Sequence, residues 1–363
     1  MTMPPQQPQR FQPQQPQRPP THWPPVPPVP PMAAMRPAPA PSPWQARITA
    51  AKRAYSRAGA AITLMLVVWV LLALLLQGAV AGMLHTPQLS MWLSVVISSG
   101  VLYCIALPLG FIVLRTEPML PTRRFTLKPS RFLMYLLIAL PITYAGNIIG
   151  IVLSALLSGG QASNRILDMT GGSDWVVNIV AAVLLAPIVE EWLFRKQLIG
   201  RLRRFGELPA ILVSALFFAL FHLNLFQFFY AFGLGVLFGY VYTRTSKLRY
   251  TVGLHMLINA NGGIVAPWFM NRMMAVVEAH PTAETITNAQ MGALLSGFAY
   301  AFVLLAATLV GLVLLIVRWK RREFYLAPEQ LPRGATRRAA FGNPGVITCI
   351  VVGTLGTLLM LFA

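Results

Sequence analysis

Two adjacent carboxylates, Glu190 and Glu191, lie inside a long apolar run that begins near Trp175. The run is long enough to be expected as a membrane-spanning helix, and these two are the only acidic residues in any predicted span. A charged side chain at mid-helix disfavours membrane insertion by roughly 2.5 to 3.5 kcal/mol. An ionisable group kept there predicts a functional site, in which a carboxylate could exchange protons with water or substrate.

Helical spacing separates the two glutamates. Glu191 and Arg195 are four residues apart with the acid first, the favourable order for an intrahelical ion pair. Glu190 is rotated by about 100° from Glu191, so it can face a different neighbour. Pro187 removes a backbone hydrogen bond just before the pair and can open the helix there. The spacing therefore predicts a structural ion pair beside one free carboxylate.

Two later spans carry the partners that such a carboxylate needs. Phe218 and His222 are four residues apart and share one helix face, as do His255 and Asn259. A bundle of the three helices could gather the carboxylate, two imidazoles and one carboxamide around a water-filled cavity. Each of these residues also has a structural interpretation, as packing or as a polar contact between helices. Three further polar residues receive no role: Asn224, Gln227 and Asn261.

The composition defines the class of protein that holds these residues. Of 363 residues, 56% are hydrophobic and 11% charged, against about 25% charged in soluble domains. We therefore predict an all-α polytopic membrane protein. Cys104 and Cys349 lie in apolar runs and offer neither a disulfide framework nor metal-ligand spacing. Gly233, Gly235 and Gly239 lie inside a span and indicate close helix packing rather than a phosphate loop.

Eight to nine transmembrane helices are expected, with the fifth and sixth separated by almost no turn. The nine apolar spans are 61–84, 90–114, 132–157, 175–198, 209–228, 229–243, 250–268, 292–317 and 345–363. They define four regions: a disordered, basic Pro/Gln-rich tail (1–58), two leading helices (59–128), a core (129–270) and C-terminal helices (271–363).

Charge placement predicts the orientation. With the N-terminus in the cytoplasm and the C-terminus outside, 27 of the 29 Lys and Arg residues lie on the cytoplasmic side. Only Arg165 and Arg272 fall elsewhere. The formal charge of +19 therefore encodes orientation and some affinity for anionic membrane lipid. This positive charge does not indicate nucleic-acid binding, because it is divided among loops and is not accompanied by aromatic residues on which bases could stack.

Other hydrolase sites are absent from the sequence. It has no His-Glu-x-x-His zinc motif and no Gly-x-Ser-x-Gly nucleophile motif. It has no pair of membrane aspartates, and neither cysteine has an evident base. What is left is a site built from glutamate and histidine.

The ordered motifs resemble those of the CPBP intramembrane proteases, also called the CAAX prenyl endopeptidase type II or Abi family. The motif Glu-Glu-x-x-x-Arg matches Glu190-Glu191 with Arg195. The motif Phe-x-x-x-His matches Phe218 with His222, and His-x-x-x-Asn matches His255 with Asn259. Each motif is short, but the ordered set is specific, and it covers about residues 130–270.

The resemblance implies an endopeptidase whose site lies within the membrane and opens towards the cytoplasm. Glu190 and His222 would activate a water, and His255 and Asn259 would stabilise the oxyanion. Glu191 and Arg195 would hold the site in shape, with Phe218 packed beside them. The motifs leave open whether a Zn²⁺ ion lies between Glu190, His222 and His255, and a site without metal is preferred because the usual ligand spacing is missing.

The substrate expected from the resemblance is a hydrophobic or lipidated peptide, either a CAAX-like protein or a bacteriocin-type peptide. The Ala-, Arg- and Pro-rich composition indicates a GC-rich bacterium, so a multi-pass protein of the plasma (inner) membrane is expected. The alternative from another class is a non-catalytic membrane scaffold or bacteriocin self-immunity protein with the same fold. A transporter is disfavoured because no inverted internal repeat is evident. The oligomeric state is left open.

Overall fold

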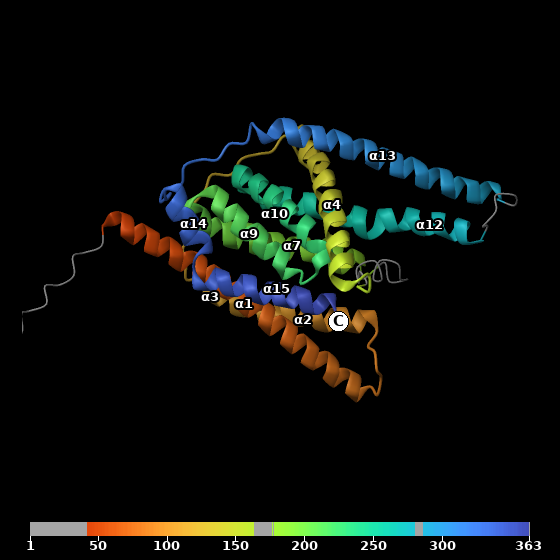
Figure 1. The fold of residues 1–363 in the computed structure, drawn as a ribbon, viewed down its shortest axis with the longest axis horizontal. Coiled ribbons are helices and arrows are strands. Elements are labelled where there is room, and N and C mark those ends of the chain that lie inside the picture. Colours follow the sequence, from red (N-terminus) through yellow and green to blue (C-terminus); the bar gives the residue numbers. More distant parts are fainter. Residues whose placement is uncertain (1–41, 163–175, 177, 280–285, 363) are drawn as a thin grey trace, which may run out of the picture. The chain divides into compact units, whose positions relative to one another are not determined.

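The computed structural model describes residues 42–162, 176, 178–279 and 286–362, and within these ranges the chain is helical without a strand (Figure 1). The predicted all-α class is confirmed. Among the described residues, six stretches are long and apolar enough to cross a membrane, judged by length and composition: Pro43–Met83, Met91–Leu114, Pro129–Ser158, Leu225–Thr245, Asn288–Trp319 and Pro344–Leu361. The expected count of eight to nine and the inside N-terminus stay predictions.

Several spans are interrupted by π-helical turns, which are rare and occur frequently at functional sites. In chain order the elements are α1 (Pro43–Met83), α2 (Met91–Val101), η1 (Leu102–Ala106), α3 (Leu107–Leu114), α4 (Pro129–Ser158), η2 (Asn178–Leu185), α7 (Ala186–Glu190), η3 (Glu191–Ile199), α8 (Gly200–Leu202), η4 (Arg203–Phe205), α9 (Glu207–Phe221), α10 (Leu225–Thr245), α11 (Leu248–Ala260), η5 (Asn261–Val265), α12 (Ala266–Ala279), α13 (Asn288–Trp319), α14 (Arg333–Phe341) and α15 (Pro344–Leu361). Of these, η1, η2, η3 and η5 are π-helical and η4 is a 3₁₀ turn.

The first helix begins earlier than predicted. A disordered tail was expected as far as residue 58, but α1 starts at Pro43. A capping box explains this start: the Ser42 hydroxyl accepts from the Gln45 amide (3.3 Å), and the Gln45 side chain accepts from the Ser42 amide (3.0 Å). Proline at the first helical position fits the same signal. The rest of the predicted tail, residues 1–41, lies outside the described residues.

The break between the fifth and sixth spans was predicted at residue 228, and this is wrong. α9 ends at Phe221 and α10 begins at Leu225. Leu223 adopts a left-handed backbone (φ 48°), which terminates α9. Asn224 then caps α10, because its side chain accepts a hydrogen bond from the Phe226 amide at 2.9 Å. The two helices form a hairpin whose open end is closed by an ion pair between Glu207 and Arg244.

The basic segment 318–344 lies between the last two predicted spans. It contains α14, a nine-residue helix that buries Ala339 and Ala340. Both are small, so they allow α14 to pack closely against α1 and α9. Its arginines lie on the opposite, exposed side, which explains why the apolar pattern alone did not reveal the helix.

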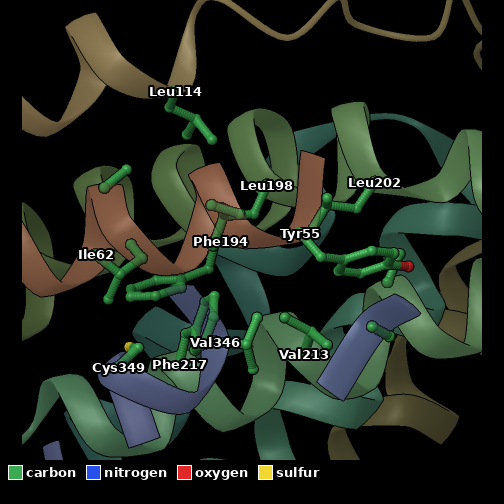
Figure 2. Close-up of a cluster of buried hydrophobic side chains, with 14 of the residues drawn as sticks. Tyr55, Ile62, Leu114, Phe194, Leu198, Leu202, Val213, Phe217, Val346 and Cys349 are labelled. Atoms are coloured by element: carbon green, nitrogen blue, oxygen red, sulfur yellow. The ribbon is translucent and has the colours of Figure 1, made fainter. Parts of the chain in front are cut away.

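The largest buried cluster joins α1, η3, α9 and α15 (Figure 2). Tyr55 and Ile62 of α1 pack with Phe194 of η3, Phe217 of α9 and Val346 of α15. All five side chains are fully buried. The leading and final helices, which lie outside the three motifs, therefore pack directly against the helices that carry them.

A second cluster packs α4 against α10, and glycines bring the helices together. A Cβ atom at Gly146 of α4 would collide with the backbone of Tyr230. On α10, a Cβ at Gly235 would lie 2.9 Å from Ala215, and one at Gly239 would lie 3.0 Å from Ile211. These contacts confirm that the α10 glycines serve helix packing.

We expect Gly146→Leu to destabilise the protein by about 1–3 kcal/mol, the usual cost of forcing a side chain into a closely packed contact. Thermal unfolding in detergent would measure the change as a lower Tm. Gly78→Leu is the matched control, because nothing lies within 4 Å of the Cβ position at Gly78 in α1. Equal Tm values for the two variants would contradict the close α4–α10 contact.

Candidate active site

The ion pair predicted between Glu191 and Arg195 is present and is bidentate. Arg195 Nε donates to Glu191 Oε2 at 2.9 Å, and a terminal guanidinium nitrogen donates to Oε1 at 3.0 Å. Both side chains are fully buried. Pro187 lies at the start of α7, one turn before the pair, and cannot donate a backbone hydrogen bond. The backbone is π-helical on both sides of α7, so the carboxylates lie at a locally irregular helix.

His255 lies between the two glutamates, with one carboxylate near each ring nitrogen. Its Nδ1 is 3.2 Å from Glu191 Oε1, and its Nε2 is 3.7 Å from Glu190 Oε2. Glu191 is already held by Arg195, so it fixes the orientation of the imidazole. Glu190 keeps 22% of its side chain exposed, whereas Glu191 has none exposed. Glu190, the free carboxylate predicted from the sequence, is therefore the more exposed of the two.

Phe218 is the contact that links the two histidines. Its ring meets His222 edge to face at a centroid distance of 4.8 Å and His255 at 5.8 Å. The Arg195 guanidinium lies over the same ring at 4.8 Å. His222 itself lies at the C-terminal end of α9, where its Nδ1 is 2.7 Å from the Phe218 carbonyl oxygen. Among the described residues, no hydrogen bond or ion pair joins His222 to Glu190 or His255.

Asn259 lies one turn beyond His255 on α11 and faces the helix that carries the glutamates. Its side-chain amide donates to the Ala182 carbonyl of η2 at 2.8 Å. This bond uses one of its two N–H groups. The structure thus brings Glu190, Glu191, Arg195 and His255 into contact and places Asn259 beside them, while His222 is linked to them through its contact with Phe218.

Two residues of this assembly were not predicted. Ser214 receives a weak hydrogen bond from Arg195 (3.5 Å) and donates to the Phe194 carbonyl (2.7 Å). It precedes Phe218 by four residues, so an extended search along that helix face could have found it. The ring of Phe238 on α10 lies 5.5 Å from His255, and no sequence signal indicates this contact.

The three polar residues without a predicted role all have partners. Asn224 caps α10, as described above. Gln227 donates to the Tyr230 hydroxyl at 2.8 Å, and this hydroxyl lies within electrostatic range of Glu190. Asn261 accepts from the Tyr300 hydroxyl at 2.9 Å, which ties η5 to α13.

A cavity of about 310 Å³ borders His222. Its walls come from α1, α2, α15 and the start of α10, and they include Trp69, Ser98 and Asn224. Trp69 Nε1 donates to the Ser98 hydroxyl at 3.0 Å, which fixes one wall. The remaining lining is mostly apolar, so the cavity offers His222 an apolar approach between the leading and final helices.

The residues considered for zinc do not form a metal site in the part of the chain that the structure describes. No group of three or more His, Cys, Asp or Glu side chains there is placed to hold a metal ion. Both histidine rings pack against Phe218, and among the described residues no ion pair joins His222 to Glu190. We therefore derive no chemical step through a metal.

The fold and site define a helical membrane protein with a buried Glu–His–Arg cluster beside a partly exposed glutamate. Residues 172–261 match the family model described as type II CAAX prenyl endopeptidase Rce1-like. This range contains all three sequence motifs. Over these residues the chain is similar to the CPBP family of CAAX proteases, as the motifs predicted.

A curated relative supports the same family. The membrane-embedded CAAX protease MroQ of Staphylococcus aureus (strain USA300) is 32% identical over 121 residues. The match covers 31% of this chain and 49% of the relative, so the chain spans about half the length of the relative it matches. No solved structure was found to match.

Proposed function

We propose that this protein is an intramembrane endopeptidase that hydrolyses peptide bonds of membrane-associated substrates. The family supports a protease. The observation that carries the proposal is the cluster around His255, where one buried and ion-paired glutamate contacts the ring while a second glutamate stays partly exposed. A purely structural ion pair between Glu191 and Arg195 needs neither Glu190 nor the imidazole.

In the proposed reaction, Glu190 is the general base. The 3.7 Å between its Oε2 and His255 Nε2 is too long for a direct hydrogen bond and leaves space for a bridging water or a substrate oxygen. Glu190, with His222 on the cavity side, takes a proton from water as the water oxygen bonds to the scissile carbonyl carbon. Glu190 then returns the proton to the amine nitrogen as the C–N bond breaks, which balances the hydrolysis.

His255 and Asn259 are the proposed donors to the oxyanion. Glu191 accepts from Nδ1 of His255, so Nε2 is the ring nitrogen left for the substrate, and it donates when the ring is protonated. Asn259 keeps one N–H group after bonding to Ala182. Donors held in place by other contacts stabilise a developing charge strongly in a site that excludes water.

The proposed substrate is a hydrophobic or lipidated peptide of the membrane, CAAX-like or unlipidated. The apolar cavity beside His222 supports this, because an apolar peptide segment could reach the site from between the spans.

We further propose a multi-pass protein of a bacterial plasma membrane, with the N-terminus and the opening of the site on the cytoplasmic side. The distribution of Lys and Arg supports this orientation.

The test is cleavage by the purified full-length protein in liposomes. A farnesylated CAAX peptide and an unlipidated hydrophobic peptide would be compared, with products identified by mass spectrometry and with a chelator arm to test metal dependence. We expect cleavage of at least one peptide. If folded, monodisperse protein cleaves neither, the non-catalytic scaffold becomes the better interpretation.

A further inference from the structure

A second cavity, of about 670 Å³, lies away from the glutamates at the basic ends of the spans. Its size falls in the range of roughly 300–1,000 Å³ that is usual for ligand pockets. Four basic side chains line it: Arg124, Lys196, Lys247 and Arg249. No acidic residue lines it. The cavity is therefore a concentrated positive region.

The four cations lack carboxylate partners, although other basic residues of the protein have them. Within the described ranges none of the four forms an ion pair, whereas Arg57, Arg204 and Arg244 pair with Glu117, Glu329 and Glu207 respectively. Lys247 donates to the Thr126 hydroxyl and Arg249 to the Tyr250 hydroxyl, both neutral acceptors. Around this one cavity, the described part of the chain thus gathers four like charges that form no ion pair.

Backbone hydrogen bonds hold the walls of the cavity in place. The connection between α3 and α4 crosses it and is tied at two points: the Leu120 amide donates to the Gly200 carbonyl (2.8 Å), and the Phe125 amide donates to the Thr245 carbonyl (2.9 Å). The N-terminus of α11 forms another wall, and no side chain caps it. Free backbone N–H groups and the helix dipole at such a terminus attract anions.

An independent observation is a buried arginine, Arg203, that contacts two residues of the cavity lining. Arg203 is 4% exposed and, within the described part of the chain, has no ion-pair partner, and its Nε atom has no hydrogen-bond partner. A terminal nitrogen of Arg203 donates to the Ser246 hydroxyl at 3.2 Å, and its guanidinium lies over the Tyr242 ring at 5.8 Å. Both Ser246 and Tyr242 line the cavity. The carboxylate whose charge acts on Arg203 is Glu207, which already pairs with Arg244. A buried cation without an ion pair of its own is costly, so an anion in the cavity would offset its charge.

We propose that this cavity binds a phosphate-bearing anion, the headgroup of an anionic phospholipid at the membrane surface. Basic pockets between spans are typical sites for such headgroups. The bound headgroup would contact η3 through Lys196 and α11 through Arg249, the two elements that carry Glu191 and His255. The inference does not depend on the proposed peptidase activity, because it rests on a different cavity.

The test is ligand-induced thermal stabilisation of the purified full-length protein in detergent. Dioctanoyl phosphatidylglycerol, dioctanoyl phosphatidylcholine and inorganic phosphate would be titrated separately. We expect a saturable rise in Tm with phosphatidylglycerol alone. Lys196→Gln/Arg249→Gln should weaken its apparent affinity about 30-fold, because each removed charge contributes about 1 kcal/mol near the surface and 1.4 kcal/mol is a factor of ten.

The matched control is Arg333→Gln/Arg337→Gln on α14, which removes the same charge from two exposed side chains. It should leave the apparent affinity within about twofold of the unmodified protein. If both double variants lost the same amount of apparent affinity for phosphatidylglycerol, binding would depend on general surface charge, and the proposed site would be overturned. Equal stabilisation by inorganic phosphate would overturn the lipid as its source, and no stabilisation by any of the three would overturn the proposal.

Discussion

Glu190→Gln is expected to lower peptide cleavage by at least about 100-fold, the smaller end of the effect of losing a general base. Glutamine has nearly the shape of glutamate but cannot take a proton from water. Glu190 is partly exposed and forms no ion pair with Arg195, so the substitution should leave folding intact. The measurement is the initial rate of peptide cleavage in liposomes at equal amounts of folded protein.

Glu278→Gln is the matched control, because Glu278 lies exposed on α12 and makes no ion pair among the described residues. The Glu278→Gln protein should cleave the peptide at the same rate as the unmodified protein. Both variants should elute as the unmodified protein does in size-exclusion chromatography. A Glu190→Gln protein that cleaves normally would remove Glu190 from catalysis. If phosphatidylglycerol still raised the Tm of that protein, the lipid site would stand by itself.

Contacts within one helix could be predicted from the sequence, because helix geometry is local. The pairing of Glu191 with Arg195 and the contact of Phe218 with His222 follow from a spacing of four residues. The contact of Glu191 with His255 joins residues 64 positions apart, so it depends on how α11 packs against η3. No spacing rule carries that information.

The same limit explains the misplaced end of α9. The apolar run continues through the turn, so hydropathy alone does not mark the end of the helix. Asn224 is of a residue type that favours turns and helix starts, but the spacing of the motifs assigns it no role. The structure makes it the cap of α10 and thereby places His222 at a helix end. At that end His222 borders the apolar cavity, a position that a mid-helix histidine would not have.

The second large effect concerns stability. We expect Arg195→Ala to destabilise the protein by about 3–5 kcal/mol, because it leaves Glu191 as a buried charge without its bidentate partner. His255 alone cannot replace the two hydrogen bonds from the guanidinium. The readouts are the folded yield in detergent and the Tm. Arg204→Ala is the matched control: its pair with Glu329 is about one quarter exposed, so its loss should cost at most about 1 kcal/mol.

A second variant separates the ion pair from packing around it. Glu191→Leu/Arg195→Met removes both charges and fills the space with apolar side chains, so it should be more stable than Arg195→Ala. It should nevertheless be inactive, because His255 loses the carboxylate that orients its ring. Normal yield and Tm for Arg195→Ala would mean that the fully buried Phe194 and its aromatic neighbours position this segment without the ion pair. Glu191 would then serve the imidazole alone, and Arg195 would have no structural role in the site.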